Sequence, residues 1–259
     1  MLTYLVQKCK EIAISAGAEI MEVYESDIDP GIETKSDNSP LTIADKRAND
    51  LIVKNLKELK YNFPIVSEES KEVPYGERKN YTYLWMVDPL DGTKEFIKRN
   101  GEFTVNIALI HENRPILGVV YAPVQQALYW AAKGEGAYYQ IGDGPTKNAI
   151  SSSFSLKHSG IRVVCSRSHL NQSTLDLLDK LDDPQLIRTG SSLKFMLIAK
   201  GEADFYPRLG PTMEWDTAAS DIIVEESGGK IVQMEDEKPL LYNKPSLLNP
   251  NFLTLGKTI

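Results

Sequence analysis

Hydrophobic residues at the start of the chain recur every three to four positions, which is the spacing of one face of an α-helix. This pattern covers residues 2–24 and predicts one long amphipathic helix, broken by the stretch 27–30. A second run with the same spacing, 43–59, follows Thr42, whose hydroxyl suits a helix N-cap. Asp45 lies in the first turn of this second helix, where an acid commonly completes a capping box or faces the helix dipole.

From residue 64 to about 142 the apolar runs become short and are separated by turns, a pattern typical of β-strands. The segment 112–115 predicts a hairpin turn between two of them. Pro89 is expected to end the strand that precedes it, because proline cannot donate a hydrogen bond within a central strand. We expect a mostly antiparallel sheet covered by the two N-terminal helices. Its predicted strands are 65–66, 83–87, 104–110, 116–121, 127–131 and 137–139.

The second half of the chain alternates between strand-like and helix-like segments, after a Ser-, Gly- and Lys-containing stretch at 142–160 that marks the best candidate boundary. The fold class is therefore α/β or α+β, built of helix and sheet layers. We expect two lobes, 1–155 and 156–259, compact enough to count as one domain. The predicted elements are strands at 161–165 and 204–206 and helices at 171–181, 193–200 (capped by Ser191 or Ser192) and 215–227 (closed by Gly228 and Gly229).

Composition and charge narrow the class of protein further. At 259 residues the chain can bury a large core, and its 42% hydrophobic and 25% charged residues are ordinary for a soluble globular protein. The net charge of −7 argues against binding to nucleic acid, and a phosphorylated substrate would need cations at its own site. Two Cys and three His suggest neither a disulfide framework nor a zinc site. Without a cleavable signal or a membrane-spanning run, we expect a cytoplasmic protein, monomeric or homodimeric, with peripheral attachment to the inner membrane left open.

The hexapeptide 88–93, Asp-Pro-Leu-Asp-Gly-Thr, is the most informative motif of the chain. Its carboxylates, Asp88 and Asp91, follow a predicted buried strand, and burying them together is costly unless a cation neutralises them. Carboxylates, carbonyls and water are the ligands that Mg²⁺ or Mn²⁺ favours. Gly92 allows a tight turn or a close approach to a ligand. Because Asp, Pro and Gly are also common in turns, an ordinary turn with Asp as a cap stays open at this point.

Further acids occur at the ends of other predicted elements. Glu68 and Glu69 follow a strand, and Asp216 begins a helix. Each alone is explained by a solvated loop or a helix cap. Together, the Glu-Glu pair, the hexapeptide and the segment Trp-Asp-Thr-Ala-Ala at 215–219 resemble the signature of the inositol monophosphatase superfamily of Mg²⁺-dependent, lithium-sensitive phosphatases. The resemblance covers nearly the whole chain.

Two positions depart from the superfamily pattern, and neither removes a ligand. Many members have Gly where this chain has Ser67, and Glu214 adds an acid directly before Trp215. Four other segments resemble the bacterial 3'(2'),5'-bisphosphate nucleotidase branch of the superfamily. They are residues 94–104, 166–169, 190–195 and 206–208.

The resemblance implies a fold and an activity. The fold is a layered helix-sheet-helix-sheet-helix sandwich of the inositol monophosphatase and fructose bisphosphatase type, in which the second lobe completes a site begun by the first. The activity is Mg²⁺-dependent hydrolysis of the 3'-phosphate of adenosine 3',5'-bisphosphate, a small-molecule substrate, to AMP and phosphate. The sulfated relative 3'-phosphoadenylyl sulfate is a second candidate substrate, which would place the enzyme in sulfur metabolism.

Three alternatives to this activity stay open. An inositol monophosphatase-type phosphomonoesterase is the alternative within the superfamily. An aspartyl-phosphate phosphatase would form a covalent intermediate, and it favours Asp-x-Asp spacing where this chain has two intervening residues. A non-catalytic Ca²⁺-binding module would bind metal without hydrolysis.

The resemblance also implies roles for individual residues. Asp45, Thr93 and Glu68 would be catalytic, with Thr93 and Asp45 orienting a water for attack. Two or three Mg²⁺ ions would be held, two of them sharing Asp88 and clamping an in-line displacement. The metal ligands would be Glu68, Asp88, the Leu90 carbonyl, Asp91 and Asp216. The substrate would contact Leu90, Asp91, Gly92, Thr93 and Asp216 and, through a second phosphate and the nucleoside, His169, Ser191, Lys194 and Arg208.

The same residue types also have structural explanations. The Thr93 hydroxyl can bond its own turn, and Lys194 and Arg208 can be surface charges. His169 can be a polar residue at a helix start. We expect Trp215 to pack beside Asp216 and anchor it.

Overall fold

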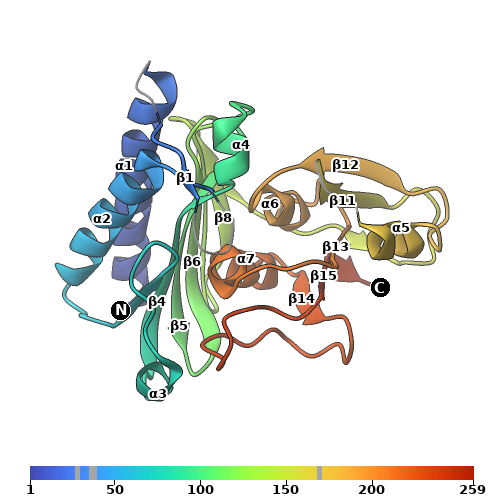
Figure 1. Cartoon of the computed structure of the whole chain (residues 1–259). Coiled ribbons are helices and arrows are strands. Elements are labelled where there is room, and N and C mark those ends of the chain that lie inside the picture. Colours follow the sequence, from blue (N-terminus) through green and yellow to red (C-terminus); the bar gives the residue numbers. More distant parts are fainter. Residues whose placement is uncertain (27–29, 35–39, 168–170) are drawn as a thin grey trace.

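The structure is a computed structural model of the chain and describes residues 1–26, 30–34, 40–167 and 171–259 (Figure 1). Its helices are α1 (Leu2–Glu25), α2 (Ile43–Lys57), α3 (Tyr75–Arg78), α4 (Thr93–Ile97), α5 (Gln172–Leu178), α6 (Leu193–Ala199) and α7 (Glu214–Glu226). Its strands are β1 (Glu33–Thr34), β2 (Pro40–Leu41), β3 (Ile65–Ser67), β4 (Tyr83–Asp91), β5 (Thr104–His111), β6 (Arg114–Ala122), β7 (Ala127–Ala132), β8 (Gly136–Ile141), β9 (Lys147–Asn148), β10 (Ser153–Phe154), β11 (Arg162–Ser166), β12 (Gln185–Thr189), β13 (Phe205–Arg208), β14 (Lys230–Gln233), β15 (Phe252–Leu255) and β16 (Lys257–Thr258). In the part of the chain described, no helix combines the length and the apolar character that crossing a bilayer requires.

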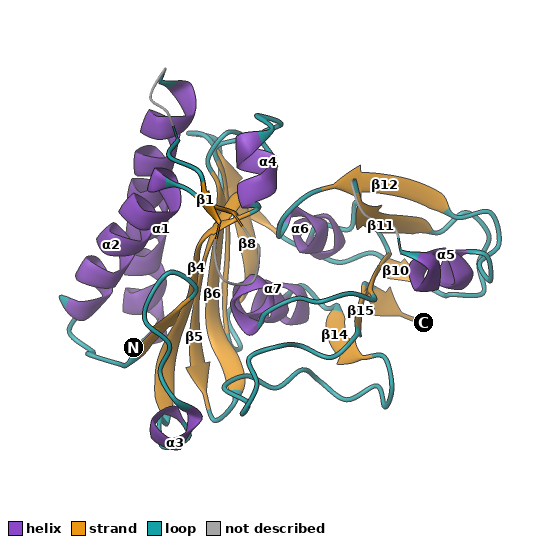
Figure 2. Cartoon of the chain, in the orientation of Figure 1, coloured by secondary structure: helices purple, strands orange, loops and turns teal. Residues whose placement is uncertain are grey.

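A seven-stranded sheet with the order β3-β4-β5-β6-β7-β8-β9 forms the centre of the first half. β3 and β4 are parallel, and every other neighbouring pair is antiparallel. α1 and α2 cover one face of this sheet and α7 covers the other (Figure 2). Trp85 of β4 belongs to the core under α1 and α2, whereas Met86 belongs to the core under α7, because successive side chains of a strand point to opposite faces. The predicted sheet and its two covering helices are confirmed.

A second, five-stranded sheet has the order β12-β11-β13-β15-β14. α6 and α7 lie between the two sheets, and α5 covers the outer face of the second sheet (Figure 1). Leu178 of α5 packs with Val163 on that outer face, while Val164 of the same strand joins the core shared with α6 and α7. The layers therefore follow the expected helix-sheet-helix-sheet-helix order.

Strand β6 carries Gly118 directly beneath α7, and this glycine sets how closely the helix approaches the sheet. A Cβ atom at Gly118 would overlap the carbonyl oxygen of Ala219 and would lie 2.6 Å from Cγ2 of Ile222. Because α7 carries Asp216 in its first turn, the approach of this helix to the sheet also positions an acid of the candidate site.

The predicted end of the strand before Pro89 is wrong. β4 continues through Pro89 to Asp91. The pairing is irregular there, since Asp88 pairs with Asn106 and Asp91 with Thr104, and the register shifts between these two pairs. Such a bulge leaves residues outside the regular hydrogen-bond ladder, so a proline is tolerated within a central strand. The sequence analysis also missed β12, β14 and β15 and the short helices α3 and α4.

The chain leaves the first sheet after β9, inside the stretch predicted as a boundary. One hydrophobic cluster nevertheless contains buried side chains from both halves, such as Met86 and Phe252. The division into two lobes at residue 155 stays a proposal.

Candidate metal centre and active site

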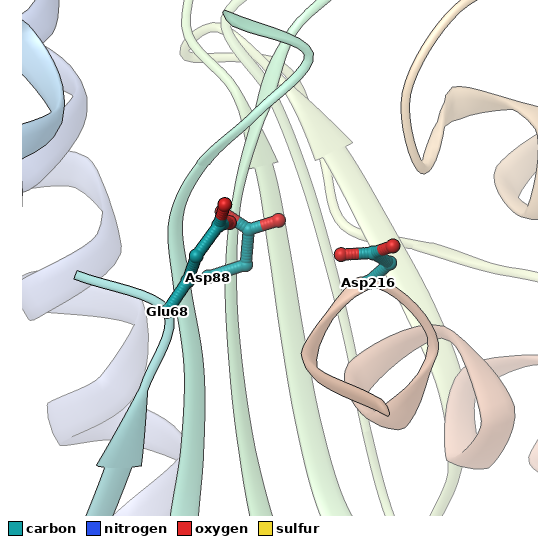
Figure 3. Close-up of side chains that lie close together, drawn as sticks. All are labelled: Glu68, Asp88 and Asp216. Atoms are coloured by element: carbon teal, nitrogen blue, oxygen red, sulfur yellow. The ribbon is translucent and has the colours of Figure 1, made fainter. Parts of the chain in front are cut away.

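Three acids from different parts of the chain converge where β3 and β4 end. Glu68 directly follows β3, Asp88 lies on the neighbouring parallel strand β4, and Asp216 lies in the first turn of α7. Figure 3 shows the Glu68 and Asp88 carboxylates side by side, with Asp216 facing them from α7. One carboxylate oxygen from each residue lies within 4.8 Å of the other two. The structure therefore brings together three of the predicted metal ligands.

Hydrogen bonds to the protein fix one oxygen of each of three aspartates, of which Asp88 is buried and Asp91 and Asp216 are half-buried. Asp88 Oδ1 accepts from the Leu90 N–H at 3.1 Å, and Asp216 Oδ2 accepts from the Met213 N–H at 2.9 Å. Asp91 Oδ2 accepts from the hydroxyls of Ser191 and Ser192, at 2.7 and 3.0 Å. Among the residues that the structure describes, none donates to the second oxygen of these three aspartates. Each aspartate thus keeps one oxygen for a cation.

The electrostatics of the cluster also favour a cation. Burial and the charges of Glu68, Asp91, Asp216 and Asp45 raise the pKa of Asp88 well above its ordinary value. Burial and the charges of Asp91 and Glu68 likewise raise the pKa of Asp216. Several carboxylates held together out of water repel one another unless a positive charge lies between them. Because the candidate ligand atoms of these residues are all carboxylate oxygens, the residues fit a hard divalent cation such as Mg²⁺.

Asp45 and Thr93 meet beside this cluster. The Thr93 hydroxyl donates to Asp45 Oδ1 at 3.0 Å, and Asp45 is 1% exposed. Asp45 Oδ2 accepts from the backbone N–H and the hydroxyl of Thr42, at 2.8 and 2.5 Å. Asp45 therefore closes the predicted capping box with one oxygen and contacts Thr93 with the other. The Thr93 hydroxyl also lies 3.3 Å from the Leu90 carbonyl, but its single proton favours the charged acceptor.

Gly92 has the left-handed backbone that the hexapeptide needs at this point. Its φ is 98°, and it forms the N-cap of α4. A Cβ atom here would lie 3.0 Å from the carbonyl oxygen of Glu102 and 3.3 Å from Cα of Phe103. Both the backbone conformation and the space therefore select glycine.

The predicted second-phosphate residues have different surroundings. Lys194 is 8% exposed and donates to the Ser191 carbonyl at 2.7 Å, so its interpretation as a surface charge is wrong. Burial lowers the pKa of Lys194 to about 8, against the opposing influence of Asp91. Arg208 donates to the Thr212 hydroxyl at 2.6 Å and to the Pro211 carbonyl at 2.9 Å.

A pocket of about 370 Å³ lies beside Arg208. Its lining includes Lys94, Cys165 and Tyr206, so it combines two cationic side chains with an aromatic wall. His169, predicted beside the base or ribose, lies outside the described residues.

Two residues just before the Asp216 turn have structural functions. Glu214 is fully buried and accepts from the Asn243 N–H at 2.5 Å and from the Lys244 ammonium at 2.5 Å. The acid whose role the sequence left open therefore holds the loop after residue 240 in place. Trp215 is partly buried and packs against the hydrophobic core, as expected for a residue that anchors Asp216.

Sequence reasoning missed the polar residues that support Asp91. Thr104 and Asn106 of β5 are buried and connect with Ser191 and Ser192 through side-chain hydrogen bonds. The sequence analysis named Ser192 as a possible helix cap and as part of the segment 190–195, without a role at Asp91. The contacts from Thr104 to Ser191 and from Asn106 to Ser192 join residues 87 and 86 positions apart in the chain, so local spacing gives no signal for them.

Known proteins resemble this chain over almost its whole length. Residues 2–258 match the inositol monophosphatase family. The 3'(2'),5'-bisphosphate nucleotidase CysQ of Escherichia coli (strain K12) is 44% identical, over 96% of this chain and 98% of the relative. The corresponding Salmonella typhimurium protein is 42% identical over the same shares.

Solved structures show the same relationship. The crystal structure of CysQ from Bacteroides thetaiotaomicron superposes with a TM-score of 0.86 and 43% identity, covering 98% of this chain and 97% of the other. An inositol monophosphatase from Anabaena (Nostoc) sp. PCC 7120 superposes with a TM-score of 0.73 and 25% identity, covering 99% and 91% of the two chains. The sequence match and the shared architecture together establish that this chain belongs to the inositol monophosphatase family.

Proposed function

We propose that the protein is a metal-dependent 3'(2'),5'-bisphosphate nucleotidase that converts adenosine 3',5'-bisphosphate to AMP and phosphate. The convergence of Glu68, Asp88 and Asp216, with Asp91 beside them, carries the proposal that the site is a metal-dependent phosphatase. The choice of substrate is supported by relatives of 42–44% identity that bear this name and match nearly the full chain. We include 3'-phosphoadenylyl sulfate as a second candidate substrate.

The proposed cofactor is Mg²⁺, two or three ions of it. Glu68, Asp88, the Leu90 carbonyl, Asp91 and Asp216 would hold these ions. When bound, they supply positive charge at the phosphoryl group and make water more acidic.

The residues of the chain supply orientation and a route for a proton. Because the Thr93 hydroxyl donates to Asp45, its oxygen is free to accept a hydrogen from a water beside the phosphate. That water would be held in line with the bond to be broken, and its proton would pass to Asp45 through the Thr93 hydroxyl. Backbone N–H groups at Gly92 and Thr93 would orient phosphate oxygens in the tight turn. Positioning of this kind accounts for much of phosphoryl-transfer catalysis.

A second phosphate would need cations away from the acids. Arg208 is well placed for this role because it lines the 370 Å³ pocket. Among the residues that the structure describes, the Lys194 ammonium donates one hydrogen bond, to the Ser191 carbonyl, so its other N–H groups can contact the second phosphate. Contacts of Ser191 with this phosphate and of His169 with the nucleoside remain parts of the proposal.

The cellular setting is also proposed. We infer a cytoplasmic enzyme, monomeric or homodimeric, with peripheral attachment to the inner membrane left open. Inhibition by lithium belongs to the same proposal, since family resemblance alone suggests it.

The substrate assay tests the proposed function directly. Purified protein with Mg²⁺ would be given adenosine 3',5'-bisphosphate or an inositol monophosphate, and released phosphate and AMP would be measured. We expect a much higher kcat/KM for the bisphosphate and no turnover in EDTA. Comparable or higher kcat/KM for the inositol monophosphate would favour the alternative activity of the family. A trapped phospho-aspartate, or metal binding without hydrolysis, would point to the alternatives outside it.

A further inference from the structure

A buried network of hydroxyl and amide groups lies beneath Asp91. Ser191 and Ser192 both donate toward Asp91 Oδ2, and Asn106 Nδ2 donates to the Ser192 hydroxyl at 3.0 Å. The Thr104 hydroxyl bonds Asn106 Oδ1 at 2.9 Å and lies 2.7 Å from the Ser191 hydroxyl. Ser192, Asn106 and Thr104 are at most 1% exposed, so bulk water does not compete for these contacts.

Ser192 is the centre of this network. Its hydroxyl oxygen lies 3.0 Å from Asp91 Oδ2, 3.1 Å from the Asp216 carbonyl oxygen and 3.0 Å from Asn106 Nδ2. A hydroxyl has a single proton to donate, and the amide of Asn106 already uses one of its acceptor positions. The proton is therefore shared in a three-centre hydrogen bond between the Asp91 carboxylate and the Asp216 carbonyl, with the charged carboxylate as the stronger acceptor. The contact from Thr104 to Asn106 Oδ1 fixes the amide so that its N–H faces Ser192.

The hydroxyl oxygen of Ser192 connects two parts of the candidate metal centre. Asp91 comes from β4 in the first half of the chain, and Asp216 comes from α7 in the second half. The Ser192 hydroxyl contacts the side chain of the first and the main chain of the second. Rotation of the Asp91 carboxylate, or movement of α7 away from β4, would break one of these contacts.

We propose that Ser192 is a positioning residue that sets the geometry of Asp91 and Asp216, and with it the affinity of the metal centre for a divalent cation. This inference rests on the proposed metal-dependent function of the same site. Ser191 also bonds Asp91, but it is a candidate for substrate contact and has a left-handed backbone, with φ of 51°. Ser192 contacts Asp91 and Asp216 of the metal centre and the supporting amide of Asn106. Removing its hydroxyl should therefore weaken metal binding and leave substrate contacts in place.

Metal binding by the full-length protein without substrate is the primary test. Mn²⁺ would be titrated calorimetrically into wild type and Ser192→Ala. We expect one class of sites to weaken by roughly 10–100-fold, the usual effect of removing a group that orients a metal ligand. In activity assays the Mg²⁺ concentration for half-maximal rate should rise by a similar factor, while KM for the bisphosphate at saturating Mg²⁺ stays near the wild-type value.

Ser220→Ala is a matched control. Ser220 lies on α7, is fully buried like Ser192, and its hydroxyl has no hydrogen-bond partner among the described residues. The chemical change is therefore the same, but no contact with the acids is lost. This variant should bind Mn²⁺ as the wild type does.

The outcomes separate this inference from the proposed function. Wild-type Mn²⁺ affinity in Ser192→Ala would overturn the positioning role, even in an active nucleotidase. A protein that binds Mn²⁺ but hydrolyses neither substrate would overturn the proposed function, while the titration still decides the role of Ser192. If circular dichroism shows that Ser192→Ala does not fold, Asn106→Ala decides the question. It frees the Ser192 hydroxyl to rotate, and wild-type affinity in that variant would equally overturn the inference.

Discussion

Replacing Asp88 by asparagine should stabilise the metal-free protein while abolishing the proposed activity. Asp88 is 1% exposed, and its carboxylate lies within 4.8 Å of those of Glu68 and Asp216. At an effective dielectric constant of about 20, two unit charges at roughly this separation repel by about 3.5 kcal/mol. Burial and the neighbouring carboxylates raise the pKa of Asp88, so protonation already relieves part of this repulsion. Asparagine keeps the oxygen that accepts from the Leu90 N–H and removes the charge.

We therefore expect Asp88→Asn to raise the free energy of unfolding of the metal-free protein by about 1–3 kcal/mol at about pH 8. This gain is smaller than the full repulsion because protonation of Asp88 already relieves part of it. For a chain of this size each kcal/mol corresponds to a rise in Tm of about 2–4 °C. Because the folded protein retains protons that the unfolded chain releases, the stability of the metal-free wild type falls as pH rises above about 4. The advantage of the variant should consequently be larger at about pH 8 than at pH 5.

Scanning calorimetry in EDTA measures this effect. Asp236→Asn is the matched control, since Asp236 lies at the surface and forms its one ion pair within the described part of the chain with the neighbouring Lys238. This variant should have the same Tm as the wild type. With saturating Mg²⁺ the order should reverse, because the wild type gains stability from binding. A variant no more stable than the wild type in EDTA at pH 8 would refute the view that the acids repel one another in the metal-free protein.

Three further predictions concern individual side chains. Thr93→Val should lower kcat by about 10²–10⁴-fold with unchanged Mn²⁺ affinity, and a normal kcat would remove the hydroxyl from the reaction. Lys194→Ala should raise KM for the bisphosphate more than KM for a monophosphate. Because burial lowers the pKa of Lys194 to about 8, this side chain loses its positive charge above that pH, and the wild-type KM for the bisphosphate should rise there. Equal effects of the substitution on both substrates would argue against a second-phosphate contact. Burial raises the pKa of Asp221 to about 7, so its contribution to the free energy of unfolding declines as pH rises from about 4 to 7. Asp221→Asn should flatten that part of the stability profile in urea titrations, and an unchanged slope would contradict it.

The sequence predicted elements well where one strong periodicity dominates. α1, α2 and the strands of the first sheet follow the apolar pattern closely, because each buries a defined face. β12 was missed because its residues are mostly exposed and polar and give no alternation. β4 runs through Pro89 because the pairing breaks there, which propensity alone does not predict.

The candidate site was predictable where a motif specified it. The resemblance drawn from the Glu-Glu pair, the hexapeptide and the Trp-Asp segment is confirmed at the level of the family and of the nucleotidase relatives. Lys194 was ambiguous in the sequence, although its neighbours Leu193 and Phe195 are also buried, as is typical of a helix packed between two sheets. The network of Ser192 and Asn106 depends on tertiary structure, and no pattern along the chain predicts it.

Gly118 carries no reacting group, yet the close contact between this glycine and α7 makes the activity of the enzyme sensitive to substitution there. Even alanine at position 118 would press on the carbonyl of Ala219, one helical turn beyond Asp216. The helix would have to lift, and its acid would move with it. Variants collected by random mutagenesis for lost turnover should therefore include substitutions of this glycine, in proteins that still fold and still carry every ligand.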